Sequence, residues 1–240
     1  MNKGKKYHDD TKYVREKMKS RFLDWSKKPK DFKQYLHPLK VIPLKKTKLG
    51  GPPIFDIMAK RRSIRDYSIT PISYEELSTL IWSVSGITGK YGDHFFRTTP
   101  SAGGLYPVEI YIMVNRVKEL EKGLYHVDVK ENQLEMIKKG SFGKLLSRAA
   151  LDQELIERSA VSFIFTAIFE RSIWKYEDRA FRYIYMDAGH IGQNLYLAAT
   201  ALGLGCCTIG AFFDDEVNDI LSIEKEKEIA IYLAAIGKYR

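Results

Sequence analysis

The sequence predicts a globular chain in which helices and strands interleave, forming one domain or a tightly joined pair. Hydrophobic residues make up 45% and charged residues 29% of its 240 residues, which is the balance of a folded protein. Strand-like apolar runs occur at 108–114, 160–169 and 229–236, and apolar stripes at helical spacing at 73–84 and 182–202. No β-α-β unit carries G-x-G-x-x-G, so a dinucleotide-binding Rossmann fold is not predicted.

The positive charge is concentrated in the N-terminal segment. Residues 1–50 contain 16 Lys and Arg against 5 Asp and Glu, whereas residues 51–240 contain 23 against 25. Aromatic side chains are interspersed among the first fifty residues, unlike in a disordered tail. We therefore predict a helix at 11–24 and then an extended arm that lies across the body or a partner subunit. Two glycines and two prolines at 50–53 separate this basic segment, 1–50, from the main domain, 51–240.

Local signals predict the first half of the main domain. Ser73 and Glu76 form a capping box ahead of an apolar helical stripe. A run rich in β-branched residues follows a turn with two adjacent glycines, and two later strand-like runs are separated by three polar residues, as in a hairpin. In chain order, the predicted elements are a short helix at 54–62, a helix at 73–84, a loop at 86–97, a turn at 100–104, a strand at 108–114, hairpin strands at 124–129 and 133–137, and a helix at 142–155.

The second half contains an uncharged segment, 191–213, which is long enough to raise the question of a membrane span. Glycines and polar residues interrupt it, so we predict a buried helix followed by a glycine-rich turn. In chain order, the predicted elements are a strand at 160–169, a charged loop at 170–182, a helix at 182–202 that glycines end, a turn at 203–210, a short helix at 214–221 and a strand at 229–236.

Cysteine content and the first residues indicate a compartment. The two cysteines, Cys206 and Cys207, are adjacent, and a bridge between neighbours is strained. Neither has a C-x-x-C partner, so no metal site is predicted. Residues 1–10 are polar and lack the apolar region of a signal peptide. We expect a reduced, cytoplasmic protein that has neither nucleic acid nor a membrane as its partner.

A basic cluster follows the first short helix of the main domain. Arg61, Arg62, Ser63 and Arg65 place three guanidinium groups and a hydroxyl within five residues. Arginine forms forked, charge-assisted bonds to phosphate oxygens, so the cluster matches what a bound phosphate requires. The alternative is a solvated basic helix end. A nucleic-acid patch is disfavoured, because basic and aromatic neighbours are lacking.

Glycines mark two further segments, at 100–104 and 203–210. A glycine lets backbone amides approach a planar ligand closely. Each segment is equally compatible with a plain turn, one before a strand and the other after a helix.

Taken in order, the segments at 61–65, 100–107 and 187–205 resemble the FMN-dependent nitroreductase superfamily, and within it the SagB-type branch of azole-forming dehydrogenases. The resemblance covers roughly residues 54–240. It implies an α+β fold with a mostly antiparallel central sheet flanked by helices. It also implies a domain-entwined homodimer that shares two FMN sites at its interface.

The resemblance implies a role for each segment. The FMN phosphate and ribityl chain would be held by Arg61, Arg62, Ser63, Arg65, Lys238 and Arg240. One face of the isoalloxazine would lie along Pro100, Ser101, Ala102, Gly103 and Gly104. Backbone amides would face flavin N5 and O4 from Cys207, Thr208, Ile209 and Gly210. At Gly104 many nitroreductases carry Asn, so a direct side-chain bond to the flavin would be lost here.

Adjacent Lys175 and Tyr176 resemble the pair that azole-forming members use as acid and base. Oxidising a thiazoline or oxazoline ring requires the loss of a proton while a hydride leaves to flavin N5, and an amine or a phenol can take that proton. The alternative is an exposed pair in the charged loop at 170–182. His190, on the apolar helix, is predicted to be a core or interface residue.

Three functions follow from these observations. The first is an FMN oxidoreductase that acts on a heterocycle in a modified peptide, with a cyclodehydratase and a precursor peptide as partners. The second is an NAD(P)H-dependent nitroreductase or quinone reductase, with NAD(P)H as a transient electron donor. The third is a non-enzymatic protein that binds nucleic acid or an anionic membrane through its basic segment.

Overall fold

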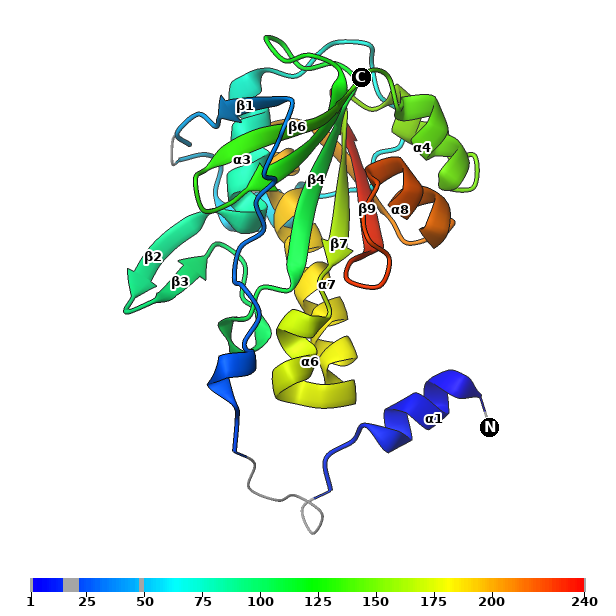
Figure 1. Cartoon of the computed structure of the whole chain (residues 1–240). Helices are drawn as coiled ribbons and strands as arrows, with labels where there is room; N and C mark the ends of the chain where they lie inside the picture. Colours follow the sequence, from blue (N-terminus) through cyan, green and yellow to red (C-terminus); the bar gives the residue numbers. More distant parts are fainter. Residues whose placement is uncertain (1, 15–21, 48–49, 240) are drawn as a thin grey trace.

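A seven-stranded antiparallel sheet forms the centre of the computed structural model, which describes residues 2–14, 22–47 and 50–239 (Figure 1). The strand order is β1-β6-β5-β4-β7-β9-β8, and every neighbouring pair runs antiparallel. The strands are Lys40–Pro43 (β1), Val108–Val114 (β4), Gly123–Asp128 (β5), Gln133–Lys139 (β6), Val161–Ala167 (β7), Gly205–Ile209 (β8) and Ile229–Gly237 (β9). The predicted α+β fold with an antiparallel sheet is confirmed.

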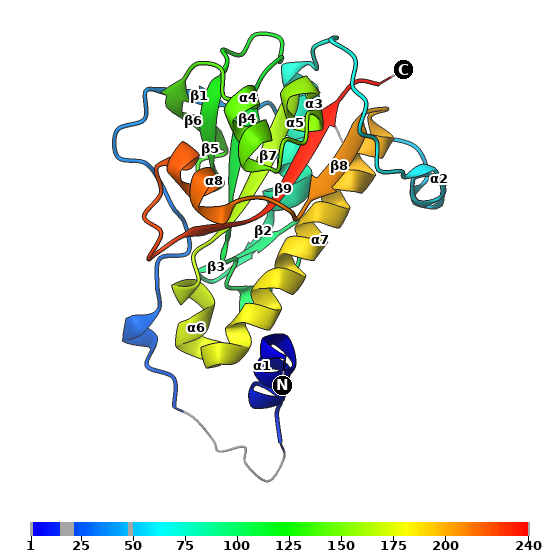
Figure 2. The ribbon, with the colours of Figure 1, turned by 90° about the vertical axis from the view of Figure 1, so that its right-hand side faces the viewer.

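Helices cover both faces of the sheet (Figure 2). One face lies against α3 and α7, and the other lies against α4, α5, α8 and the extended N-terminal arm. The helices are Lys3–Asp10 (α1), Ile54–Lys60 (α2), Tyr74–Ser85 (α3), Gly143–Ala149 (α4), Leu155–Arg158 (α5), Glu170–Tyr176 (α6), Ala180–Ala201 (α7) and Asp214–Leu221 (α8). Within the described ranges, no helix is both long enough and apolar enough to cross a membrane.

Alternation along the strands builds the two faces. In β4, Ile110 and Ile112 pack toward α3 and α7, whereas Tyr111 and Met113 face the opposite side. All seven residues of β4 are buried, as expected for a strand between two covering layers. The strand is therefore continuously apolar or aromatic except at Glu109.

The N-terminal arm lies across the sheet. Strand β1 adds to the outer edge, where Lys40 pairs with Met136 and Pro43 with Gln133. Before this strand, the backbone N–H of Tyr35 donates to the carboxylate of Glu135 at 3.1 Å. The arm thus joins the body by strand pairing and by polar contacts.

Most elements predicted for the main domain are confirmed, and the capping box of α3 is present with both of its hydrogen bonds. The predicted helix at 11–24 is wrong where the structure describes it. Helix α1 begins after Asn2 and ends at Thr11, whose hydroxyl donates to the Tyr7 carbonyl at 2.7 Å and whose own carbonyl accepts from Arg179 at 2.6 Å. Residues 15–21 of the predicted helix lie outside the described residues.

Four other predictions in the main domain are corrected. The loop at 86–97 is a two-stranded ribbon, Ile87–Tyr91 (β2) and His94–Arg97 (β3), which turns at Gly92 with φ 57°. The helix at 142–155 is broken by Leu151 and Asp152, both with positive φ. The charged loop at 170–182 contains α6, and the turn at 203–210 contains β8.

Candidate active site

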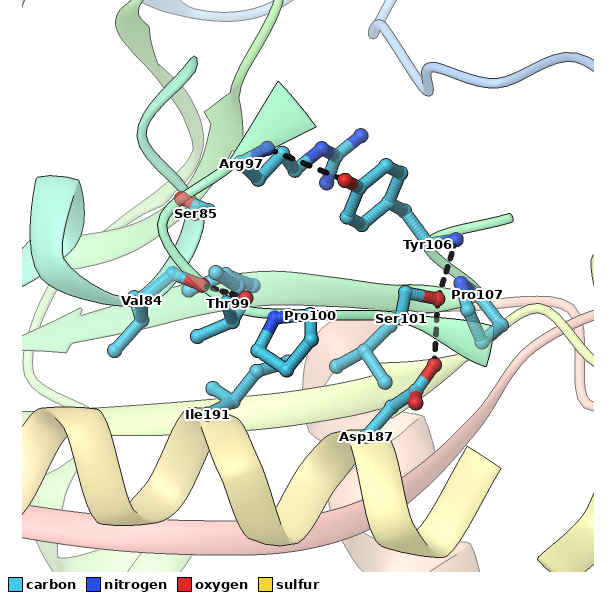
Figure 3. A pocket seen from close by; sticks show the side chains of 12 residues that line it. Val84, Ser85, Arg97, Thr99, Pro100, Ser101, Tyr106, Pro107, Asp187 and Ile191 are labelled. Atoms are coloured by element: carbon cyan, nitrogen blue, oxygen red, sulfur yellow. Dashed lines mark hydrogen bonds between the residues drawn. The ribbon is translucent and has the colours of Figure 1, made fainter. Parts of the chain in front are cut away.

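The 100–104 loop is held in place by a carboxylate from α7. Asp187 accepts a hydrogen bond from the Ser101 hydroxyl at 2.6 Å (Figure 3). It accepts another from the Ala102 backbone N–H at 3.2 Å. Burial raises the pKa of Asp187, while the bonds from Ser101 and Ala102 oppose that rise. The Ser101 oxygen also accepts from the backbone N–H of Tyr106 at 2.9 Å. One helical side chain therefore sets the shape of the whole loop.

Lys175 and Tyr176 reach the same loop from α6. A Cβ atom placed on Gly103 would lie 2.5 Å from Tyr176 Oη and 2.9 Å from Lys175 Nζ, so the polar ends of both side chains reach this glycine. Gly103 also has φ 65°, which favours glycine. Both side chains are half-buried. The alternative of an exposed pair in a surface loop is wrong, because 170–176 is helical and packs against α7.

The ring of Tyr176 packs against that of Tyr183 beside this pair. The ring centroids of Tyr176 and Tyr183 lie 4.9 Å apart in an edge arrangement, and Arg179 Nε donates to the Tyr183 hydroxyl at 2.8 Å. Burial raises the pKa of Tyr176, and the neighbouring Tyr183 adds to that rise. On the outer side of the loop lies a pocket of about 270 Å³, lined by Pro100, Ser101, Ala102, Tyr183, Met186, Asp187 and His190. Its volume is at the small end for a ligand site.

The basic cluster lies elsewhere, beside the edge strand β8. The Ile64 backbone N–H donates to the Cys206 carbonyl at 3.0 Å, and the Ser63 hydroxyl lies 2.9 Å from Tyr196 Oη. The Arg61 guanidinium lies over the Tyr196 ring, 5.2 Å from its centroid. Among the described residues, no carboxylate lies within 4.0 Å of any guanidinium of this cluster. Uncompensated guanidiniums are what an anion such as a phosphate requires.

The predicted amide segment is strand β8 and its continuation. The Thr208 backbone N–H points away from β9 and donates to Tyr196 Oη at 3.0 Å, and the Thr208 hydroxyl accepts from Tyr232 at 2.7 Å. Cys207 and Ile209 are buried in the core. Burial also raises the pKa of the Cys206 thiol, so this cysteine is not in a setting for thiolate chemistry.

The roles of Lys238 and Arg240 as phosphate ligands stay predictions. Lys238 Nζ lies 3.7 Å from the Glu76 carboxylate of α3. Arg240 lies outside the described residues. His190 is predicted to be a core or interface residue. On this chain it is exposed beside the 100–104 loop, so the prediction of a core position is wrong. In the described part of the chain, no group of His, Cys, Asp and Glu could hold a metal ion.

The site residues therefore form two groups along α7. Asp187, which holds the 100–104 loop, precedes Tyr196, which contacts the basic cluster, by nine residues, or about 14 Å of helix. The chemistry of the two groups fits FMN: one offers cations and a hydroxyl to a phosphate, and the other offers an open glycine backbone beside an amine and a phenol.

Sequence reasoning missed the side chains that support these groups. Asp187, Tyr183 and Arg171 had no assigned role, although each is a polar residue within a helix. A charged residue on the buried stripe of a helix is the signal that marks Asp187, since such residues are rarely buried without a partner. Arg171 had no such signal, because its helix was not predicted.

Comparison with known proteins agrees with the fold. The family model described as the nitroreductase family matches residues 58–238, and the chain belongs to this family. It is 40% identical over 183 residues to a candidate nitroreductase of Methanocaldococcus jannaschii, covering 76% of this chain and 89% of that protein. It is 32% identical over 153 residues to the trifolitoxin-processing protein TfxB of Rhizobium leguminosarum, covering 62% and 41%. The microcin B17-processing protein McbC of Escherichia coli is 25% identical over 146 residues, covering 59% and 54%.

Solved structures share the architecture. A candidate nitroreductase of Anabaena variabilis superposes with a TM-score of 0.82 and 32% identity, covering 97% of this chain and 45% of that one. A microcin synthetase McbBCD complex of E. coli contains a chain with the same fold, with a TM-score of 0.64 and 17% identity. The chain thus spans only about half of several proteins that it matches.

Proposed function

We propose that this chain is an FMN-dependent oxidoreductase of the SagB type that oxidises thiazoline or oxazoline rings of a modified peptide to azoles. The observation that carries the proposal is the convergence of Lys175 and Tyr176 on Gly103, in the loop that the family resemblance assigns to the isoalloxazine. The similarity to proteins named for the processing of trifolitoxin and microcin B17 supports a peptide substrate.

FMN would be held at both groups of residues. Arg61, Arg62 and Arg65 would bind the phosphate with Ser63, and the 100–104 loop would lie along the ring system. Because the family resemblance implies FMN sites shared at a dimer interface, we propose that two copies of the chain complete each site. Exposed apolar side chains support this homodimer, since Phe55 on α2 is 80% exposed and Tyr185 on α7 is 56% exposed.

When bound, FMN supplies a hydride acceptor at N5. The side chains of this protein deal with the other hydrogen. One ring carbon of the azoline loses its hydrogen as a proton to the Lys175 amine, beside the Tyr176 hydroxyl, and the neighbouring carbon loses its hydrogen with the electron pair to the flavin, so the bond between them becomes double. Asp187 holds the loop in place through Ser101 while this occurs. The ring itself must come from an earlier cyclodehydration of a Cys, Ser or Thr side chain, so a cyclodehydratase is the expected partner.

A synthetic peptide with one thiazoline tests the proposal, with loss of two hydrogen atoms read by mass spectrometry. Lys175→Ala and Tyr176→Phe are expected to slow the reaction by about 10²- to 10⁴-fold at unchanged FMN content. Lys144→Ala, an exposed lysine on α4, is the matched control and keeps the wild-type rate. Full FMN content together with a full rate in Lys175→Ala would contradict the acid/base role. A colourless protein that gains no FMN on reconstitution would contradict any flavin function.

A second candidate function is an NAD(P)H-dependent nitroreductase or quinone reductase. The observation in its favour is the match to the M. jannaschii candidate nitroreductase, which covers more of both sequences than the matches to the processing proteins. Rapid bleaching of the bound flavin by NADH or NADPH, followed by reoxidation with a quinone, is the expected result. A flavin that neither nucleotide bleaches would exclude this function.

A further inference from the structure

A buried ionic chain crosses the sheet face opposite α7. It runs from Arg171 on α6 to Glu109 on β4, His126 on β5 and Glu135 on β6, and these residues are at most 5% exposed. His126 Nε2 lies 2.9 Å from Glu109, and His126 Nδ1 lies 2.8 Å from Glu135. Each ring nitrogen thus has a carboxylate oxygen as its hydrogen-bond partner, and these two hydrogen bonds favour the imidazolium form of His126.

Opposite charges balance along this chain. Burial alone would raise the pKa of Glu109, but Arg171 and His126 more than offset that effect and hold the pKa at about 2. A second pair lies alongside, where Lys33 of the arm binds the buried Glu228. With His126 charged, three cations face three carboxylates, and each of these carboxylates has a cationic partner. Arg97 also lies near Glu109 and helps to lower the pKa of that carboxyl.

Arg171 connects the buried ionic residues to the candidate active site. Its Nε donates to the Lys30 carbonyl of the arm at 2.9 Å, and its Nη1 donates to the Tyr106 carbonyl at 3.1 Å as well as to Glu109. Tyr106 lies two residues after Gly104, and its own N–H is bound by Ser101. Lys175 lies one helical turn after Arg171 on α6. A single buried guanidinium therefore connects α6, the 100–104 loop, the sheet and the arm.

The backbone conformation explains why such a connection is needed. Tyr106 has φ 45° at the end of the loop, and Glu177 has φ 50° directly after Tyr176. Residues other than glycine disfavour a positive φ, so both segments keep these conformations only when their surroundings hold them. The Arg171 bond to the Tyr106 carbonyl supplies that restraint at one of the two positions.

We propose that Arg171 is the positioning residue of this site: it fixes α6, and with it Lys175 and Tyr176, against the 100–104 loop. The proposal rests on the proposed function in taking Lys175 and Tyr176 as the groups that handle the proton. The claim that Arg171 holds α6 against the 100–104 loop does not depend on that function and is measured separately.

Three variants separate positioning from folding. Arg171→Lys keeps the charge beside Glu109 but loses the planar fork that reaches Lys30 and Tyr106 together. Arg171→Gln combined with Glu109→Gln removes one charge of each sign, so the net buried charge is unchanged. Arg158→Gln is the matched surface control, since Arg158 pairs with Glu154 in solvent at 2.7 Å.

Hydrogen exchange followed by mass spectrometry on the FMN-loaded protein is the first measurement. In Arg171→Lys, we expect faster exchange at 101–106 and 170–176, unchanged exchange in β4 and β7, and an azoline oxidation rate lower by about 100-fold at unchanged FMN content. The double variant is expected to regain thermal stability while its exchange stays fast and its rate stays low. Arg158→Gln is expected to match the wild type throughout.

Two results would overturn the proposal. One is wild-type exchange in both segments of Arg171→Lys. The other is a rate that returns to normal together with stability in the double variant, because the role of Arg171 would then be structural only. Lys175→Ala, measured in parallel, reports on the proposed function: a full rate in that variant removes the acid/base pair, whereas the exchange data still decide whether Arg171 holds the two segments together.

Discussion

The two faces of the central sheet are built from alternate residues of the same strands, yet their chemistry differs. On the side of α3 and α7, strands β4 and β7 present Ile110, Ile112, Phe163 and Phe165. On the other side, under the arm, the same strands and their neighbours present the buried ionic chain that includes Glu109, and also Tyr111 and Thr166. The first face packs mainly through apolar side chains, whereas the second combines apolar contacts to α4, α5 and α8 with charged and directional bonds to the arm.

This difference matches what each face has to carry. Helix α7 is long, and an apolar interface suits it because its position is set by many weak contacts. The arm has no helix or large apolar stripe where it crosses the sheet, and α6 has only seven residues. Directional bonds from Glu135, Glu228 and Arg171 fix these small segments where burial of apolar area would not suffice.

The largest loss of stability is expected from a substitution in the apolar face. Phe163→Ala removes a fully buried ring between β7 and the helices, and is expected to lower the free energy of unfolding by about 3–5 kcal/mol. Denaturant unfolding followed by circular dichroism measures this loss. If the two faces are independent, proteolysis of the arm below the unfolding transition stays at the wild-type rate; faster cleavage there would contradict the separation.

A smaller effect is expected on the ionic face. Glu135→Gln keeps the shape of the side chain but removes the charge beside His126 and weakens the bond from the Tyr35 N–H, for a loss of about 2 kcal/mol. Unlike Phe163→Ala, this variant is expected to speed proteolysis within residues 22–47 before global unfolding. Glu131→Gln, an exposed residue on the turn before β6, serves as the control.

A change of pH tests the same ionic face reversibly, through the charge of His126. Burial would lower the pKa of His126, but the hydrogen bonds to Glu109 and Glu135 raise it above the ordinary 6.5. The stabilisation is therefore complete below pH 6.5 and is lost as the pH rises through the folded-state pKa, by about 1.4 kcal/mol for each unit by which the two pKa values differ. Tyr35 and Tyr111 also pack against this ring, and the nearby Lys33 ammonium opposes the carboxylates by lowering the pKa of His126.

Thermal midpoints measured upward from pH 6.5 check this expectation, with His126→Gln as the comparison. The variant is expected to lose this part of the pH dependence. On the acid side, Glu109 acts in the opposite sense, since its pKa of about 2 lies below the ordinary 4.5 and its contribution is lost as the pH falls between those values.

The smallest effect concerns a helix end on the apolar side. Ser73→Ala removes the side chain that caps α3, and is expected to cost about 1 kcal/mol. Unfolding in urea measures it, and Ser141→Ala at an exposed position is the control. A loss as large as that of Phe163→Ala would mean that the position of α3 depends on its cap rather than on its apolar stripe.

Much of the fold was predictable because periodicity reports burial. The strands at 108–114, 161–167 and 229–237 and the helices α3, α7 and α8 have strong local patterns, and the capping box at Ser73 marks its helix end. The ribbon at 87–97 carried a signal that was overlooked, namely a Gly-Asp turn between two short β-rich runs. Strand β8 looked like a turn, because its partner β9 decides its conformation.

The candidate site was predictable only through motifs. Lys175 and Tyr176 were found by resemblance, whereas their helix was not, because α6 is short and is held by Arg171 and by contacts with α7. Such tertiary bonds leave no local trace. The buried chain through His126 was hidden for the same reason: Glu109 and Glu135 each look like an ordinary surface carboxylate in a sequence.

Strand β1 has a consequence for the order of events during synthesis. Its partner, β6, is translated about a hundred residues later, and the Glu228 that binds Lys33 comes 195 residues after it. At ribosomal rates of about 5–20 residues per second, the arm waits for roughly 10–40 s before all its bonding groups exist. The many lysines of the first fifty residues keep the waiting segment hydrated and mutually repelling, so the charge that balances Glu228 in the finished molecule first serves to keep a nascent chain from associating with its neighbours.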